Sequence, residues 1–138
     1  MKFRALVLDD NDIIRTLLST VLMKRGYEVR SFSDPDSCPL FKVHGCSCTA
    51  TEACADMILS DVRMPHVSGL EFIEKLRKNG CKVKHVAFIS GSWTDIEYAK
   101  AKEMGCEIFN KPFNISILDR WLDSCEKDIA ADRVLTRW

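Results

Sequence analysis

The sequence has no excess of charge of either sign and no basic stripe. Lysine and arginine together number 20, and so do aspartate and glutamate. Because binding to nucleic acid or to an acidic membrane surface depends on a concentrated positive field, we expect neither partner. The sequence also lacks an apolar run near the ~18 residues that a membrane span needs. Asp9 and Asp10 interrupt the N-terminal apolar run before it could serve as a signal sequence, so we expect a soluble cytoplasmic protein.

The length of the chain leaves room for one folded domain. Its 138 residues are enough to bury a single core and too few for a second folded unit. We expect this domain to occupy residues 1–126, followed by a C-terminal tail or helix extension at 127–138. Any output must then come from the surface of this one domain.

Four short apolar runs end on polar side chains. They are residues 3–8 before Asp9 and Asp10, residues 57–59 before Asp61, residues 85–89 before Ser90, and residues 107–109 before Lys111. Such short runs are typical of buried strands in a parallel sheet, whose carboxyl ends line the crevice where open α/β sheets bind ligands. Carboxylates are ligands for Mg²⁺, whereas a hydroxyl and an ammonium suit phosphate oxygens. Taken alone, Asp61 would more often be a residue that caps the turn before the next helix.

A helix signal follows each of these four runs. Asn11 or Asp12 can begin a helix that ends at Gly26, Ser68 with Glu71 one that ends at Gly80, Thr94 with Glu97 one that runs to Met104, and Asn114 a last one. Residues 27–32 alternate apolar and polar side chains, as an edge strand does. This order predicts an α/β fold, a doubly wound five-stranded parallel sheet with helices on both faces.

Residues 34–55 break this alternation. They contain two prolines, one glycine and four cysteines without a usable hydrophobic period. We therefore expect an irregular cysteine-rich segment where a regular second crossover helix would normally lie.

Four motifs in this order carry a family resemblance over residues 3–126. Asp9-Asp10 is similar to an acidic pair, residues 61–69 to a phosphoacceptor loop, Ser90-Gly91 to a hydroxyl switch, and Lys111-Pro112-Phe113 to a lysine–proline turn. Together they resemble the receiver domain of two-component response regulators, in its stand-alone, single-domain form. The resemblance implies a flavodoxin-like sheet with strand order 2-1-3-4-5 and a site between the first and third strands.

The resemblance also implies a function and its residues. Asp61 would accept a phosphoryl group from a sensor histidine kinase or phosphotransfer protein, and the chain would not be a turnover enzyme on external substrates. Mg²⁺ would be held by the carboxylates of Asp9, Asp10 and Asp61 and by the backbone carbonyl of Arg63. Lys111 would pair with Asp61 and then with the phosphate, and Ser90 would donate a hydrogen bond to that phosphate.

Output is expected through protein docking. The family implies a face made by the last two strands and the last two helices, which would bind an unidentified downstream protein. It also implies a cis peptide bond between Lys111 and Pro112. One departure is Ile108, which stands where receivers usually carry an aromatic residue three positions before the lysine. Since Ile108 cannot form a hydrogen bond, we expect a modest conformational change on phosphorylation.

A phosphatase of the haloacid dehalogenase type is a competing interpretation. Asp10, Asn11 and Asp12 supply its Asp-x-Asp motif, and Ser90 its second motif. That chemistry also needs an acidic pair after a further strand beyond the lysine. The available candidates, Asp119 and Asp123, lie instead on a predicted amphipathic helix, which disfavours the interpretation.

A second alternative is a module that senses metal or redox state through cysteines. In an intracellular α/β domain, cysteines are thiols or metal ligands more often than disulfides. Cys38, Cys46, Cys48 and Cys54 lie within 17 residues, and four thiolates can hold a tetrahedral zinc ion that stabilises a segment without its own core. However, their spacing lacks the Cys-x2-Cys knuckle of common zinc sites. The simpler alternative is that Cys54 is buried beside the strand at residues 57–61, while the other three thiols lie in a loop.

Overall fold

Alternating strands and helices make up the described part of the chain. The computed structural model describes residues 2–35, 47–112 and 114–136. The strands are β1 (Arg4–Leu8), β2 (Glu28–Phe32), β3 (Met57–Asp61), β4 (His85–Ser90) and β5 (Glu107–Asn110). The helices are α1 (Asp12–Lys24), α2 (Gly69–Lys78), α3 (Asp95–Glu103) and α4 (Ile115–Asp128). Within these residues, none of the helices has both the length and the apolar character to cross a membrane.

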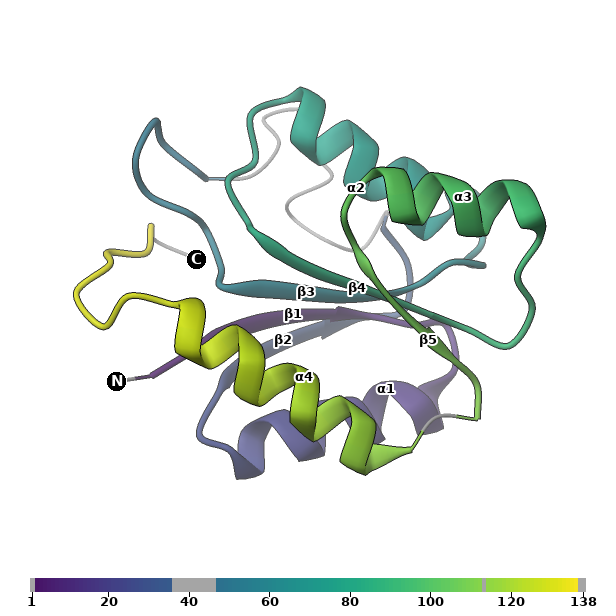
Figure 1. Cartoon of the computed structure of the whole chain (residues 1–138), viewed down its shortest axis with the longest axis horizontal. Coiled ribbons are helices and arrows are strands. Elements are labelled where there is room, and N and C mark those ends of the chain that lie inside the picture. The colour runs from purple at the N-terminus through teal and green to yellow at the C-terminus, as the bar shows by residue number, and fades with distance from the viewer. Residues whose placement is uncertain (1, 36–46, 113, 137–138) are drawn as a thin grey trace.

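All strand pairs are parallel, and the sheet order is β2-β1-β3-β4-β5. This confirms the predicted flavodoxin-like order. Figure 1 shows the sheet between two helical layers, with α2 and α3 on one face and α1 and α4 on the other. The site expected at the carboxyl ends of the strands therefore has helix starts around it.

Apolar side chains fill the space between the sheet and both helical layers. Successive side chains of a strand point to opposite faces, so Ile58 packs with α2 and α3 while its neighbour Leu59 packs with α1 and α4. The same alternation places Phe88 and Ile89 of β4 in opposite clusters. Burial of each such side chain contributes about 1.5–3 kcal/mol. Burial on both faces explains why these strands read as continuous apolar runs.

Side-chain caps begin the helices at the predicted residues. Asn11 accepts hydrogen bonds from the amides of Ile13 and Ile14 at 2.9 and 3.1 Å, and Ser68 and Asn114 cap α2 and α4 in the same way. Thr94 and Glu97 form a reciprocal capping box at α3. Such caps satisfy amides that have no partner in the first turn, typically worth ~1 kcal/mol each. These caps fix where the chain turns beyond β1, β4 and β5.

The segment between β2 and β3 is described only in part. Residues 33–35 and 47–56 contain no α-helix, and residues 36–46 lie outside the described residues. The expectation that the whole of 34–55 is irregular therefore stays a prediction. The described portion makes an isolated bridge between Ala53 and Leu135, which joins it to the end of the chain.

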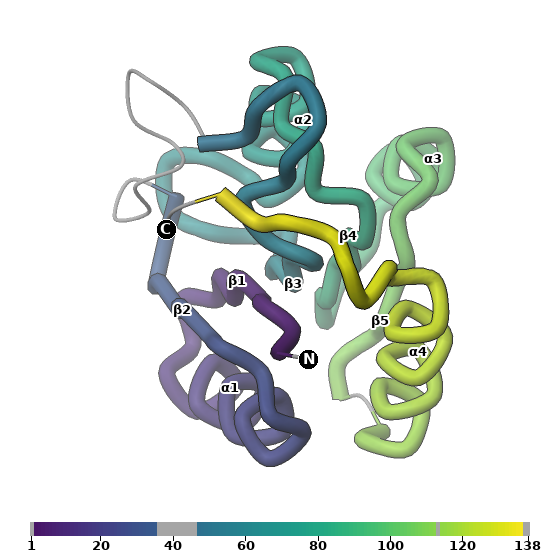
Figure 2. Tube along the Cα trace, turned by 90° about the vertical axis from the view of Figure 1, so that its left-hand side faces the viewer, coloured from purple at the N-terminus to yellow at the C-terminus, as the bar shows by residue number. Residues whose placement is uncertain are grey.

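The C-terminal tail, residues 129–136, crosses the edge of the sheet at which the strands begin, as Figure 2 shows. The Arg133 guanidinium binds the Asp56 carboxylate with both oxygens engaged, at 2.8 and 2.5 Å. Asp56 is only 6% exposed. The positive charge of Arg133 offsets the desolvation cost of burying this carboxylate. Residues 127 and 128 complete α4 rather than beginning this tail, while the division into domains stays a prediction.

Arg4 connects three separate segments at the same edge. Its guanidinium binds Glu28 of β2 at 2.6 Å, the carbonyl of Cys54 at 3.0 Å and the carbonyl of Thr136 at 2.7 Å. One side chain of β1 therefore holds β2, the cysteine-containing segment and the tail.

The start of α2 lies against the end of β3. The Gly69 amide donates to the carbonyl of Val62 at 2.9 Å. A Cβ atom at residue 69 would lie 2.1 Å from the backbone oxygen of Asp61 and 2.7 Å from the Ser60 hydroxyl. Only glycine leaves room for this approach, so Gly69 fixes where Asp61 sits relative to α2.

We predict that Gly69→Ala lowers the free energy of unfolding by about 2–3 kcal/mol, since overpacking against backbone forces a main-chain shift. Chemical denaturation measures this change. The matched control is Gly91→Ala, whose added Cβ would meet nothing closer than the Lys111 Cβ at 3.7 Å. Equal stability of the two variants would contradict the proposed packing constraint.

Candidate functional site

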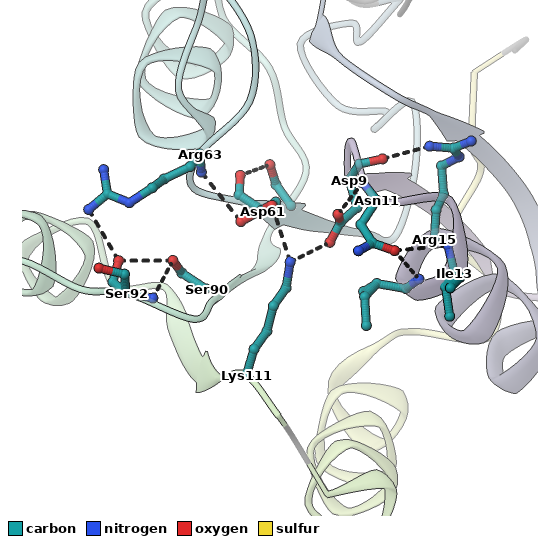
Figure 3. A network of polar contacts seen from close by, with 11 residues as sticks. Asp9, Asn11, Ile13, Arg15, Asp61, Arg63, Ser90, Ser92 and Lys111 are labelled. Atoms are coloured by element: carbon teal, nitrogen blue, oxygen red, sulfur yellow. Dashed lines mark hydrogen bonds and ion pairs between the residues drawn. The ribbon is translucent and has the colours of Figure 1, made fainter.

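Five residues predicted for the phosphoryl site lie at the carboxyl ends of four strands. Asp61 ends β3, Ser90 ends β4, Lys111 follows β5, and Asp9 and Asp10 follow β1. Figure 3 shows Asp9, Asp61 and Lys111 pointing toward one another. The parallel order of the sheet produces this convergence, because neighbouring strands end on the same side.

The Lys111 ammonium lies between two carboxylates. Its Nζ is 3.0 Å from Asp9 Oδ2 and 3.2 Å from Asp61 Oδ2. The Lys111 amide donates to the carbonyl of Ser90 at 2.8 Å, and the Lys111–Pro112 peptide bond is cis, as the resemblance implies. Asp9 is fully buried and Asp61 is 6% exposed. Two carboxylates thus share one cation in a largely water-free position.

Burial and charge shift the ionisation of this group. Burial, followed by the negative charge of Asp9, raises the pKa of Asp61, and the Lys111 ammonium opposes that shift. For Lys111, burial lowers the pKa, but its contacts with Asp9 and Asp61 together outweigh burial and leave the pKa raised. The ammonium therefore stays charged at neutral pH. Ionisation of the Asp61 carboxyl group, in contrast, costs more free energy than it would in water.

The carboxylates fit a hard divalent cation. Asp9, Asp10 and Asp61 each offer an oxygen, and these oxygens lie within 4.8 Å of one another. Asp9 Oδ2 is buried without an aligned hydrogen bond from the described residues, although it has the ion pair with Lys111. A negative pocket of oxygen donors with an incompletely satisfied atom matches what Mg²⁺ binds. The receiver-domain resemblance implies Mg²⁺ at such an acidic pocket.

Contacts from α1 hold Asp9 in place. The Asn11 amide donates to Asp9 Oδ1 at 2.9 Å, and the Arg15 guanidinium donates to the Asp9 carbonyl at 2.7 Å. Asp10, in contrast, is exposed. The sequence did not indicate Arg15, although its place one turn into the predicted helix put it within reach of the strand end.

Arg63 contacts the site through its amide. That amide donates to Asp61 Oδ1 at 3.3 Å, while the use of the Arg63 carbonyl as a metal ligand stays a prediction. The guanidinium reaches across to the β4–α3 loop, where it donates to the Ser92 carbonyl at 3.2 Å and pairs with Glu97 at 2.7 Å. Arg63 therefore connects the loop after Asp61 to the start of α3.

Ser90 is turned toward its own loop. Its hydroxyl donates to the Ser92 carbonyl at 3.0 Å and lies 3.2 Å from the Ser92 amide, which donates back. The hydroxyl therefore has no hydrogen bond with Asp61 among the described residues. Ser92 was not a predicted site residue, and its short spacing from Ser90 is the signal that could have identified this turn.

Ile108 lies on β5 beside Phe88 and is half-buried against the cluster covered by α2 and α3. Its neighbour Phe109 faces the opposite cluster, where its ring meets Trp121 edge-on with centroids 5.8 Å apart. An aromatic residue is thus present on β5, but its ring belongs to the other face of the sheet.

The acidic residues considered for phosphatase chemistry lie elsewhere. Asp119 and Asp123 of α4 pair with Arg25 at 3.4 and 2.6 Å. Arg25 caps the end of α1, so this group joins two helices on one face of the sheet. These carboxylates have an ion-pair partner and do not join the Asp61 group.

Among the described residues, the cysteine group includes Cys81, which the sequence analysis did not predict. Cys38 and Cys46 lie outside the described residues. Cys48 and Cys54 lie close together, and the third member is Cys81, with all three sulfurs within 4.8 Å of one another. The hydrogen bond with Cys81, followed by burial, raises the pKa of the Cys54 thiol. Sequence analysis missed Cys81, although Cys54 precedes β3 and Cys81 precedes its neighbour β4, and parallel neighbours begin at the same edge.

Comparison with known proteins gives consistent matches. The family model described as response regulator receiver domain matches residues 5–122. The DNA-binding transcriptional regulator NtrC of Azospirillum brasilense is 32% identical over 124 residues, which are 86% of this chain and 24% of that protein. The 3',5'-cyclic-nucleotide phosphodiesterase regA of Dictyostelium discoideum is 26% identical over 132 residues, which are 93% of this chain and 16% of that protein. The chain thus spans less than a quarter of either relative.

Solved structures match over nearly their whole length. The chemotaxis response regulator CheY4 of Vibrio cholerae superposes with a TM-score of 0.72 at 28% identity, covering 91% of this chain and 99% of that one. The sheet order β2-β1-β3-β4-β5, the convergent acidic pocket and the family match over most of the chain all point to one family. The chain therefore belongs to the response regulator receiver domain family of two-component signalling.

Proposed function

We propose that this chain is a phosphorylation-dependent signalling receiver whose Asp61 accepts a phosphoryl group from a sensor histidine kinase or a phosphotransfer protein. The observation that carries the proposal is the Lys111 ammonium placed 3.0 Å from Asp9 and 3.2 Å from Asp61. This arrangement leaves Asp61 as the carboxylate that ends a central strand beside both an acidic partner and a cation.

Each residue has a defined part in the transfer. An Asp61 carboxylate oxygen attacks phosphorus, a new O–P bond forms, and the N–P bond of the donor phosphohistidine breaks as its imidazole leaves. Asp9, Asp10 and Asp61, with the Arg63 carbonyl, would hold Mg²⁺, which supplies positive charge to the phosphate oxygens when bound. Lys111 keeps its ammonium beside the reacting oxygen and then pairs with the transferred phosphate.

Output follows from the β4–α3 loop. For its hydroxyl to donate to the new phosphate, Ser90 must break its hydrogen bond with the Ser92 carbonyl. The β4–α3 loop then loses one of its internal contacts, and Arg63, which binds both Ser92 and Glu97, is next to that change. Exposed apolar residues lie next to this loop and on α4: Ile96 is 81%, Tyr98 46% and Ile117 48% exposed. We infer that the face of β4, α3, β5 and α4 binds a downstream protein.

The phosphatase alternative has less support. The carboxylates that it would need, Asp119 and Asp123, are paired with Arg25 on the helical layer. Without a second acidic pair at the Asp61 edge, the described residues offer no further base for rapid turnover of external phosphomonoesters. We therefore infer a phosphoryl acceptor rather than a turnover enzyme.

The direct test is intact mass after treatment with acetyl phosphate and Mg²⁺. We expect the native chain to gain one phosphoryl group and Asp61→Asn to gain none, because the amide has lost the nucleophilic oxygen. Asp12→Asn, which alters an exposed carboxylate nearby on α1, should be labelled like the native chain. Labelling of Asp61→Asn would refute the assignment of the acceptor.

A second prediction concerns stability in chelator-treated, Mg²⁺-free buffer. The pKa of folded Asp61 lies above its unfolded value, so its favourable contribution is complete below the unfolded pKa and is lost as pH rises through the folded pKa. Asp61→Asn should therefore unfold at higher denaturant concentration than the native chain at neutral pH. The difference should vanish well below pH 4, roughly the ordinary range of aspartate. A native chain that is the more stable of the two at neutral pH would contradict this reasoning.

The docking proposal predicts which residues change conformation when Asp61 carries a phosphate mimic. Amide chemical shifts with a beryllofluoride phosphate mimic should move most in residues 90–98, because the Ser90–Ser92 hydrogen bonds must break. Changes around Ile108 should be smaller, since that side chain can respond only through packing. Asp61→Asn with the same mimic is the control. Shifts confined to residues 47–55 and 129–136 would argue against docking through α3.

A further inference from the structure

Three cysteines gather at the edge of the sheet opposite the Asp61 site. Cys48 and Cys54 come from the segment before β3, and Cys81 comes from the loop between α2 and β4. Figure 2 looks onto this edge, where the strands begin and the tail crosses. Cys54 is fully buried, and the other two are partly exposed. Phosphoryl transfer at the far edge uses none of them.

The spacing of the sulfurs matches that of metal ligands. The Cys48 and Cys81 sulfurs are 3.9 Å apart, and all three sulfurs lie within 4.8 Å of one another. Two thiolates bound to a tetrahedral zinc ion at Zn–S distances of about 2.3 Å stand roughly 3.8 Å apart. The Cys48–Cys81 separation is thus close to that of two zinc-bound thiolates, and the Cys54 sulfur lies within 4.8 Å of both.

Hydrogen bonds to one sulfur provide a second, independent observation. The backbone amides of Cys54 and Lys82 both donate to Cys48 Sγ, each at 3.1 Å. Two amides directed at one sulfur stabilise negative charge on it, as amides do around metal-bound thiolates. The Arg4 guanidinium donates to the Cys54 carbonyl at 3.0 Å and so holds the Cys54 backbone in place beside the cluster.

We propose that Cys48, Cys54 and Cys81 bind one zinc ion as thiolates. Each thiol loses its proton to solvent as its sulfur–zinc bond forms, and no electron is transferred. The three sulfurs leave the fourth tetrahedral position to a donor outside this set. The ion joins the segment before β3 to the loop before β4, and so stabilises a region that lacks regular secondary structure among its described residues. It is a structural site, distinct from the proposed Mg²⁺ pocket.

The primary experiment is elemental analysis of protein purified without chelator or affinity metal. We expect one zinc per native chain and one per Cys125→Ser chain, a control whose buried thiol lies on α4 in the opposite core cluster. Cys81→Ser should bind zinc at least about 100-fold more weakly, since loss even of an outer-shell partner costs 10–100-fold. Cys81 is partly exposed, so serine there should not prevent folding, which circular dichroism verifies.

Further variants distinguish this ligand set from the other cysteines. Replacing Cys38 and Cys46 together should leave measurable zinc, whereas replacing Cys54 should remove it. Zinc retained by Cys81→Ser but lost from the Cys38/Cys46 double variant would overturn the assignment. Asp61→Asn should bind zinc like the native chain, so failure of the zinc site and failure of phosphoryl transfer are separable.

A second readout uses the native chain alone. Cobalt added to the metal-free protein should give the near-ultraviolet absorption of thiolate-to-cobalt charge transfer, and zinc should abolish it. Zinc should also slow alkylation of Cys48 and Cys81 but not that of Cys125. An absence of cobalt absorption, or an intact mass showing a Cys48–Cys81 disulfide in freshly isolated protein, would overturn the proposal.

Discussion

Burial of two like charges at one edge of the sheet is the constraint on which the site depends. Asp9 and Asp61 are taken out of water within reach of the same ammonium, and both burial and the negative charge of Asp9 raise the pKa of Asp61. Lys111 cannot neutralise both carboxylates. The edge therefore favours a further cation, and in the proposed reaction the poorly solvated Asp61 carboxylate is the group that attacks phosphorus. The backbone contact between Lys111 and Ser90 holds the ammonium where this balance is possible.

The two edges of the sheet carry donors of different chemical character. Aspartate oxygens gather where the strands end, and cysteine sulfurs gather where they begin. Oxygen donors suit hard cations such as Mg²⁺, while thiolates select softer ones such as zinc. A cation suited to one edge is therefore poorly suited to the other. This separation would let the proposed zinc ion and the proposed Mg²⁺ bind one small domain without competing for the same donors.

The sequence predicted what depends on local pattern, and missed what depends on contacts between distant segments. Apolar runs and capping residues such as Asn11 and Thr94 placed the strands and helix starts, and the family motifs supplied the sheet order. Pattern alone could not show that Asp9 is buried and Asp10 exposed, because both follow the same strand. Cys81 was overlooked because 27 positions separate it from Cys54, and only the pairing of β3 with β4 brings the two together.

The side chain of Arg4 also bears on the order in which the chain folds. Its partners Glu28, Cys54 and Thr136 are 24, 50 and 132 residues away. Each doubling of a flexible loop adds only about 0.6 kcal/mol of closure entropy, but distant contacts form slowly because nearer ones must first restrict the chain. The contact with Glu28 can form with β1 and β2, whereas the contact with Thr136 awaits the rest of the sheet. We therefore expect the tail to dock last during folding and to be among the first segments to open in the native protein.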